Sequence, residues 1–312
     1  MCTCITYLNN AFYFGRNLDL DCSFGETVTI TPRNFPLIFR KAGRQDHHNA
    51  MIGMASADDS FPLYAEAVNE KGLAMAGLNF PGNAFYQQPD GKGLEIASFE
   101  VIAWLLGKCA SVAEAEEYLH EMKIVDLAFS ARMPPAPLHW MLADHEKCLV
   151  LEAVRDGLKV YENPFGVLTN NPPFEYHRMN MNNYMNLTTE SPQNRFADRL
   201  DLKPYAQGMG AMGLPGDASS ASRFVRAAFL KWNSVAPEEE KANVSQFFHI
   251  LDSVAMVRGS VVTDQGTYDI TTYSCCANAR TGVYYYKTYD DSRVRAVDMH
   301  ETDLDGKELI QR

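Results

Sequence analysis

The sequence predicts an α+β protein in which blocks of antiparallel strands are followed by blocks of helices. Short apolar runs separated by turn residues fill residues 2–80, helical spacing follows at 96–122, and strand patterns return from 137. This order argues against a doubly wound parallel sheet, in which single strands and helices alternate. Two sheets packed face to face with helices outside fit the pattern, but periodicity alone does not establish that arrangement.

The N-terminal third is expected to be β structure. The runs CTCITYL and AFYFGR flank Asn9-Asn10, which favours a hairpin turn. The segment ETVTITPRN alternates like a strand and is expected to stop at Pro32. The strand pattern continues in AMIGMAS and in LYAEAVNEKGLAMAGLNF. In the second segment, NEKG is the expected turn between two strands.

Helices and a second group of strands are expected next. Apolar residues three to four apart predict helices over 96–110 and 111–122, the second capped by Ser111 with Glu114 in the capping-box position. Further strands are predicted at 137–144, 148–154, 158–164, 165–173, 267–277, 282–289 and 294–299. Further helices are predicted at 179–187, 221–232 and 245–257.

Composition narrows the classes of function. The 312 residues carry a net charge of −11, which disfavours nucleic acid and anionic membrane surfaces as partners. Neither a long apolar run nor a basic segment leading into an apolar one is present, so we expect no membrane span or secretion signal and a cytoplasmic location. No linker or shift in composition divides the chain, so one domain over 1–312 is expected.

The cysteines do not predict a disulfide framework or a metal site. There are seven of them, an odd number with scattered spacing. The Cys2-x-Cys4 spacing is not a usual zinc spacing, and no second cysteine or histidine pair completes it. We therefore expect neither a metal nor a disulfide scaffold.

Cys2 is the first candidate for chemistry. Its small side chain favours removal of Met1, which would leave a thiol and a free α-amine on one residue. A thiol is mostly protonated at neutral pH and needs a base, and an α-amine titrates close enough to neutrality to serve. N-terminal threonine and serine enzymes use this logic. On local chemistry alone, an ordinary residue that follows the initiator is the favoured reading of Cys2.

Two charged residues are candidates to assist Cys2. A hairpin at Asn9-Asn10 folds residues 16–19 back beside residues 2–3. Asp19 would then orient the amine, and the cation of Arg16 would favour the thiolate. The alternative is a surface ion pair of little energetic value. The turn length decides which face each side chain takes, and the sequence leaves it open.

The ordered set of motifs resembles the choloylglycine hydrolase family, specifically its bacterial bile salt hydrolases. These motifs are MCT, YFGRNLDL, EKGLAMAGLNFPG, PLHWMLAD, GVLTNNPPF, GLPGDASSASRFVRAAF, QFFHILDSVAMVRG and GVYYYKTYDD. The resemblance runs nearly end to end. It implies an N-terminal nucleophile hydrolase with a four-layer αββα sandwich, which cleaves the amide joining a bile acid to glycine or taurine. It implies no metal or organic cofactor, and a homotetramer.

The resemblance also implies roles for six residues, all present. Cys2 corresponds to the nucleophile, Arg16 to the arginine beside it, and Asp19 to the partner of the α-amine. Asn79 and Asn170 correspond to the oxyanion hole, and Arg223 to the arginine of the polar network. Without the resemblance, Asn79 reads as the end of a strand, Asn170 as a turn opener and Arg223 as a solvated first-turn residue.

The substrate pocket is predicted less directly. Family loops that line it correspond to Leu18, Phe61, Ala65, Phe129, Met133 and Leu138, each of which could equally be ordinary core. The segment AFSARMPPAP resembles a mobile, proline-stiffened lid. Penicillin V acylases usually carry tyrosine at the position of Asn79, so asparagine favours bile salts. Acyl transfer through the same thioester and simple binding of amphipaths are the other readings; Cys2, Asp19 and Asn170 together argue against binding alone.

Overall fold

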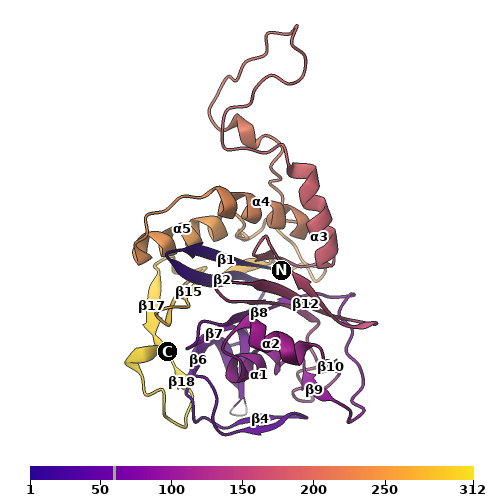
Figure 1. Ribbon diagram of the computed structural model, residues 1–312, viewed down its shortest axis with the longest axis vertical. Coiled ribbons are helices and arrows are strands. Elements are labelled where there is room, and N and C mark those ends of the chain that lie inside the picture. The colour runs from indigo at the N-terminus through magenta and orange to yellow at the C-terminus, as the bar shows by residue number, and fades with distance from the viewer. Residues whose placement is uncertain (59–60) are drawn as a thin grey trace.

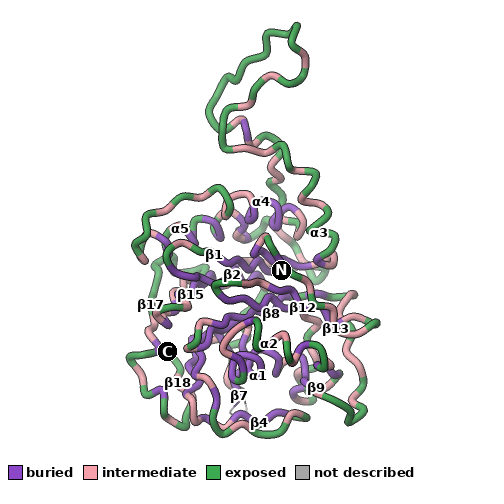
Figure 2. Tube along the Cα trace, viewed as in Figure 1, coloured by how far each residue is buried: buried purple, intermediate pink, exposed green. Residues whose placement is uncertain are grey.

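The computed structural model describes residues 1–58 and 61–312. Within these residues, two large antiparallel sheets pack face to face and helices cover their outer faces (Figure 1). This is an αββα sandwich, and it confirms the fold implied by the sequence resemblance. Figure 2 shows that both sheets are buried, whereas the segment between α3 and α4 is largely exposed.

The first sheet contains the N-terminal hairpin at its centre. Its strands, in spatial order, are β14 (Val167–Leu168), β1 (Cys2–Asn9), β2 (Ala11–Leu20), β15 (Ile270–Asn278), β16 (Val283–Thr288) and β17 (Arg295–Asp298). The second sheet runs β13 (Gly157–Glu162), β12 (Cys148–Val154), β11 (Leu138–Ala143), β8 (Ala74–Asn79), β7 (Phe61–Asn69), β6 (Met51–Asp58), β3 (Thr27–Thr31) and β18 (Ile310–Gln311).

The helices form the two outer layers. Helices α4 (Ser220–Asn233) and α5 (Glu240–Asp252) cover the first sheet, and α1 (Val101–Lys108) and α2 (Val112–Leu119) lie beyond the second (Figure 1). The remaining elements are α3 (Phe174–Asn180), the 3-10 turns η1 (Met181–Tyr184), η2 (Met209–Ala211) and η3 (Met299–Glu301), and two small strand pairs: β4 (Leu37–Phe39) with β5 (Gly43–Gln45), and β9 (Leu94–Ala97) with β10 (Met122–Val125).

The second sheet separates two hydrophobic cores. In β11, Met141 and Ala143 face the core between the sheets, while Trp140 and Leu142 face α1 and α2. This alternation follows from the two-residue period of a strand. A sheet covered on both faces must be apolar on both, which explains why β11 reads as a nearly continuous apolar run.

The structure corrects the helix predicted over 96–110. Residues Leu94–Ala97 form a strand that pairs in parallel with Met122–Val125, and the helix begins only at Val101. The buried side chain of Glu100 accepts a hydrogen bond from the Ala97 backbone at 3.0 Å and one from the Arg40 backbone at 2.6 Å. The Glu100 carboxylate thus ties the junction between strand and helix to the distant Arg40, a contact that apolar spacing alone does not reveal.

Other boundaries differ for local reasons. The helix predicted over 179–187 begins already at Phe174, directly after two prolines, and continues as a 3-10 turn to Tyr184. In 165–173 only Val167–Leu168 forms a strand. The helix predicted over 245–257 spans Glu240–Asp252, because its polar first turn carries no apolar periodicity. The helix predicted over 221–232 is confirmed within a residue at each end, and Ser111 caps α2 through the Glu114 backbone as predicted.

Candidate active site

The N-terminal hairpin places the first candidates side by side. Strand pairing sets Cys2 opposite Leu18 and Cys4 opposite Arg16. Asp19 follows on the same strand, and its backbone N–H donates to the Met1 carbonyl at 2.9 Å. Cys2, Arg16 and Asp19 are buried. The turn at Asn9-Asn10 therefore brings residues 16–19 beside the start of the chain, as the sequence predicted.

Three further predicted residues converge on Cys2 from other elements. The Cys2 backbone N–H donates to Asn170 Oδ1 at 2.8 Å, and Asn170 Nδ2 donates to the Asn79 carbonyl at 2.8 Å. Arg223 Nη2 donates to the same Asn170 Oδ1 at 2.8 Å. Its Nη1 donates to the Cys2 carbonyl and, at 2.7 Å, to Thr3 Oγ1. Asn170 is thus fixed by contacts with Cys2, Asn79 and Arg223.

Arg223 is held in place by the first turn of α4. The side chain of Ser219 caps this helix by accepting from the Ser222 backbone. The preceding Ala218 carbonyl accepts from Arg223 Nε at 3.0 Å. Burial lowers the pKa of Arg223 from its ordinary value, which lies so high that the group remains a cation at neutral pH. The site therefore contains a fixed positive charge behind Cys2 and Asn170.

Arg16 supplies a second fixed cation. Its Nη1 donates to the Gly77 carbonyl at 2.5 Å and to the Ala65 carbonyl at 3.1 Å, and its Nε lies 3.8 Å from Glu66 Oε2. Burial opposes this charge, but Cys2, Tyr273 and Glu66 outweigh it and raise the pKa of Arg16. Among the described residues, Arg16 Nη2 has no hydrogen-bond partner. Within those residues, one donor of this cation is therefore buried without a partner, and Arg16 lines the cavity described below.

Asp19 has one occupied and one open oxygen. Thr271 Oγ1 donates to Asp19 Oδ1 at 2.6 Å, whereas Oδ2 is buried without a hydrogen-bond partner in the part of the chain that is described. Burial raises the pKa of Asp19, and the Arg223 cation and the Thr271 hydrogen bond only partly offset this effect. A buried acceptor with no donor is costly, so this oxygen marks a place where a donor fits.

Cys2 and Arg16 open onto an apolar cavity of about 370 Å³. Five of the six predicted pocket residues line it: Leu18, Ala65, Phe129, Met133 and Leu138. Phe61 is not among the lining residues; its ring packs 6.1 Å from Phe99 and 6.5 Å from Phe129, behind the wall. The sequence did not single out Leu20, Phe24, Leu63, Tyr64 and Phe99, which carry no motif that separates them from ordinary core.

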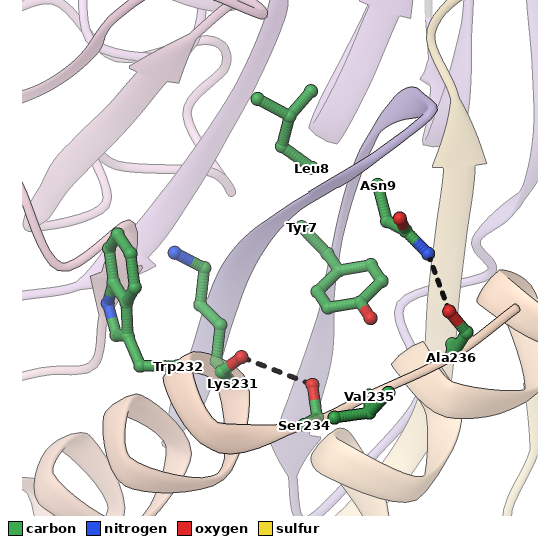
Figure 3. Close-up of a pocket in the computed structure, with 8 residues that line it drawn as sticks. All are labelled: Tyr7, Leu8, Asn9, Lys231, Trp232, Ser234, Val235 and Ala236. Carbon is green, nitrogen blue, oxygen red and sulfur yellow. Dashed lines mark hydrogen bonds between the residues drawn. The ribbon is translucent and has the colours of Figure 1, made fainter. Parts of the chain in front are cut away.

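A second cavity lies at the other end of β1 (Figure 3). It measures about 400 Å³ and is lined by Tyr7, Leu8, Asn9, Lys231, Trp232, Ser234, Val235 and Ala236. None of the six predicted catalytic residues is among these lining residues. Of these two cavities in the described part of the chain, the one at Cys2 combines an apolar wall with a candidate nucleophile.

The chemistry of the first cavity can be stated from its parts. Cys2 and Arg16 line the apolar space. The Asn170 carboxamide and the buried Arg223 cation contact Cys2, and the buried Asp19 carboxylate lies in the field of Arg223. Such a constellation suits attack on a carbonyl carbon and stabilisation of the resulting oxyanion.

In residues 1–58 and 61–312, no helix has both the length and the apolar character needed to cross a membrane.

Fold and site together define the class of N-terminal nucleophile hydrolases, in which a residue at the start of a central strand faces the cavity. The chain belongs to the choloylglycine hydrolase family of linear amide C–N hydrolases, whose family model matches residues 2–312. It is an amide hydrolase by this membership.

Individual relatives match nearly the full length of this chain. The bile salt hydrolase/transferase of Lactiplantibacillus plantarum is 50% identical over 310 residues, covering 99% of this chain and 96% of that protein. A variant of conjugated bile acid hydrolase from Clostridium perfringens superposes with a TM-score of 0.92 at 36% identity, covering 100% of this chain and 96% of that one. Penicillin V acylase from Agrobacterium tumefaciens shares the fold, with a TM-score of 0.78 at 20% identity, over 99% of this chain and 90% of that one.

Proposed function

We propose that this protein hydrolyses the amide bond of bile acids conjugated to glycine or taurine. The observation that carries the proposal is the position of Cys2 at the polar end of an apolar cavity, beside Asn170 and two buried arginines. The relatives named above as bile salt or conjugated bile acid hydrolases support the substrate class.

The cavity suits an amphipathic substrate. Leu18, Ala65, Phe129, Met133 and Leu138 offer an apolar wall to a rigid steroid body, and we assign them to substrate binding. Phe61 supports this wall through Phe99 and Phe129. Met133 to Ala136 also line the cavity, which supports a substrate-binding role for part of the segment AFSARMPPAP. The substrate amide then lies at the end that holds Cys2 and Arg16.

Removal of Met1 converts Cys2 into a nucleophile with its own base. In the chain with Met1, the Cys2 nitrogen is an amide and already donates to Asn170 Oδ1. A free amine at this position has further protons, and the open Oδ2 of Asp19 is a nearby acceptor for one of them. The amine takes the thiol proton, and Arg16 favours the resulting thiolate.

The reaction then proceeds through a thioester. The Cys2 sulfur bonds to the carbonyl carbon, and the oxyanion accepts from the second Nδ2 proton of Asn170 and from the Asn79 backbone N–H, while Arg223 holds Asn170 in place. The C–N bond breaks, and glycine or taurine leaves with the proton held by the Cys2 amine. Water, deprotonated by the same amine, cleaves the thioester and releases the bile acid. No cofactor enters these steps.

Two alternatives use the same nucleophile. Another amine in place of water would give acyl transfer, and the name of the Lactiplantibacillus plantarum relative includes a transferase. Penicillin V cleavage would need the same nucleophile, but the likeness to a penicillin V acylase shows the fold alone. Asn79, where that subgroup usually carries tyrosine, favours bile salts.

A homotetramer is part of the proposal, supported by a projecting arm. Residues 185–212 extend away from the body between η1 and α4 (Figure 1). This arm exposes several large apolar side chains: Met185, Phe196, Leu200, Leu202, Tyr205 and Met212. Exposed apolar surface of this extent is typical of interaction sites, and a second copy of the chain is the proposed occupant. One domain over 1–312 and a cytoplasmic location stay predictions.

The function is tested by comparing the wild-type enzyme with Cys2→Ser. Glycocholate, taurocholate and penicillin V are each incubated with both proteins, and release of the amine product is measured. We expect the wild type to cleave the bile salts with a higher kcat/KM than the penicillin, and Cys2→Ser to lose most of this activity while its circular dichroism is unchanged. A wild type that cleaves neither bile salt overturns the proposal, and a fully active serine variant overturns the mechanism.

A further inference from the structure

Two histidines lie behind the Asn170 loop, outside the set of predicted catalytic residues. His139 comes from β11 and His177 from α3, and both are buried. His139 Nε2 lies 3.0 Å from the Thr169 carbonyl, and His177 Nε2 lies 3.0 Å from the Asn170 carbonyl. A carbonyl oxygen only accepts, so each Nε2 carries a proton and donates. Two rings from different elements thus hold consecutive carbonyls of one loop.

His139 also contacts the segment that carries Asn79. Its ring stacks on Phe80 with centroids 4.3 Å apart and an angle of 7° between the planes. Strand β11 pairs with β8 so that Leu138 lies opposite Asn79 and His139 opposite Leu78. The His139 ring therefore connects the segment of Asn79 to the loop of Asn170.

Glu152 fixes the orientation of the His139 ring. Its Oε1 lies 3.2 Å from His139 Nδ1 and accepts from the Phe174 backbone N–H at 2.9 Å. The bond to His139 holds the ring so that Nε2 points at Thr169. The bond to Phe174 ties the same carboxylate to the start of α3, the helix that carries His177.

His177 is held by stacking rather than by a second polar partner. Its ring lies on Phe224, with centroids 4.8 Å apart and planes at 16°, and Phe224 directly follows Arg223. In the described ranges, His177 Nδ1 has no hydrogen-bond partner. Burial lowers the pKa of His177, which is consistent with a neutral ring whose single proton lies on Nε2.

We propose that His139 and His177 are positioning residues that set the spacing between the two oxyanion donors. They hold the Thr169 and Asn170 carbonyls, so the Asn170 carboxamide keeps its distance from the Asn79 backbone. This inference rests on the proposed function, because it concerns the oxyanion hole of that reaction. Donors of this kind act only when held within about 0.5 Å of their productive position.

The test compares His177→Phe with His177→Gln. Phenylalanine keeps the stacking on Phe224 but removes the donor, whereas glutamine keeps an N–H for the Asn170 carbonyl. We expect His177→Phe to lower kcat and kcat/KM together by about 10–100-fold on glycocholate. Glutamine should restore most of this loss, with melting temperatures of the two variants within a few degrees.

A second readout separates positioning from damage to the nucleophile. Alkylation of Cys2 by iodoacetamide forms no oxyanion, so its rate, followed on the N-terminal peptide, should match the wild type in His177→Phe. A variant with wild-type kcat, or one whose alkylation rate falls in parallel with kcat, overturns the inference. If the wild type itself cleaves no conjugated bile acid, the proposed function fails and this inference fails with it.

Glu152→Leu provides an independent route if His177→Phe does not fold. Leucine keeps much of the side-chain volume but removes the oxygen that contacts His139 Nδ1 and accepts from the Phe174 N–H. The His139 ring then loses the contact that orients Nε2 toward the Thr169 carbonyl. The same joint fall in kcat and kcat/KM, with unchanged Cys2 alkylation, is expected. Unchanged kcat in this variant contradicts the positioning role of His139.

Discussion

The hydroxyl of Thr271 donates to Asp19 Oδ1 at 2.6 Å while accepting from the Met256 backbone N–H at 2.7 Å. With its acceptor role already used by Met256, the hydroxyl is oriented so that its proton points at Asp19. One carboxylate oxygen is thereby fixed, and the other is buried with no hydrogen-bond partner among the described residues. The role that we propose for Asp19 is to hold the amine that removal of Met1 would produce.

Replacing Asp19 with asparagine tests this role. The new carboxamide can still accept from Thr271, but it presents either an uncharged oxygen or an N–H donor to the Cys2 amine. We expect Asp19→Asn to lower kcat/KM for glycocholate by about 10²–10⁴-fold, as loss of an orienting carboxylate does in catalytic triads. Thr271→Val serves as the matched control and should cost less, because it leaves the carboxylate in place. Equal activity of Asp19→Asn and wild type would contradict the assignment.

Replacing Asn170 removes the side chain that several site residues share. Asn170→Ala loses the carboxamide donor proposed for the oxyanion and frees Arg223 Nη2. We expect kcat to fall by about 10²–10³-fold, the usual cost of one oxyanion donor. Asn171→Ala is the control, since its side chain contacts Asn83 and the Pro81 carbonyl instead. A larger loss in the Asn171 variant would place the donor elsewhere.

Processing of Met1 decides whether the Cys2 amine is available. In the chain with Met1, that nitrogen is acylated and cannot accept a proton. We expect intact-mass spectrometry of active enzyme to show a mass lower by one methionine residue. A preparation that retains Met1, separated by chromatography, should be inactive on glycocholate. Full activity with Met1 present would exclude the amine as the base.

Lys231 predicts a dependence of stability on pH. Burial lowers its pKa to about 8, although the ammonium donates to the Phe165 carbonyl at 2.8 Å. The unfolded chain keeps an ordinary lysine pKa near 10.4, so between about pH 8 and 10.4 it binds more protons than the folded chain. This group's contribution to the unfolding free energy therefore rises with pH in that window, and its cost is fully present below pH 8.

Lys231→Met should therefore be more stable than the wild type at pH 7, by about 1–3 kcal/mol, with the difference shrinking toward pH 10. Trp232 Nε1 still donates to the Phe165 carbonyl in this variant. Urea unfolding at both pH values measures the effect, and Lys241→Met, at an exposed position, is the control. A difference that does not change with pH would show that burial of the charge is not its origin.

The projecting arm predicts the behaviour of the assembly. Phe196 and Tyr205 are each 83% exposed. If they are buried between copies, Phe196→Glu with Tyr205→Glu should dissociate the tetramer, as measured by sedimentation velocity. Val235→Glu, at a position 87% exposed but outside the arm, should not. A monomeric wild type, or dissociation by the Val235 variant alone, would contradict a role of the arm in assembly.

The sequence predicted the N-terminal hairpin because the residues of its turn determine it. Asn10 adopts a positive φ of 58°, which asparagine tolerates better than most residues, so two asparagines suffice to specify the turn. Once the turn is known, strand pairing sets Arg16 and Asp19 beside the chain start. Most strands of the two large sheets were predicted for the same reason, since alternation and turn residues are read over a few positions; the short strand Ile310–Gln311 was not.

The rest of the site depends on contacts between distant segments. Asn79, Asn170 and Arg223 look like a strand end, a turn and a first helical turn, and only the family resemblance joined them in advance. The resemblance assigned Phe61 to the cavity lining, but its ring packs on Phe129 behind the cavity wall. His139 carried no local signal either, because its partners Glu152 and Thr169 come from other elements.

The cavity is lined partly by strands of the two large sheets and partly by a connection between strands. Cys2 lies within β1, where a slip of one residue in pairing would turn every side chain to the opposite face. The opposite wall includes Met133 to Ala136, which belong to a connection between strands and take no part in the two large sheets. Substitutions in this connection would therefore reshape the apolar wall without disturbing the strand pairing that holds Cys2 in place.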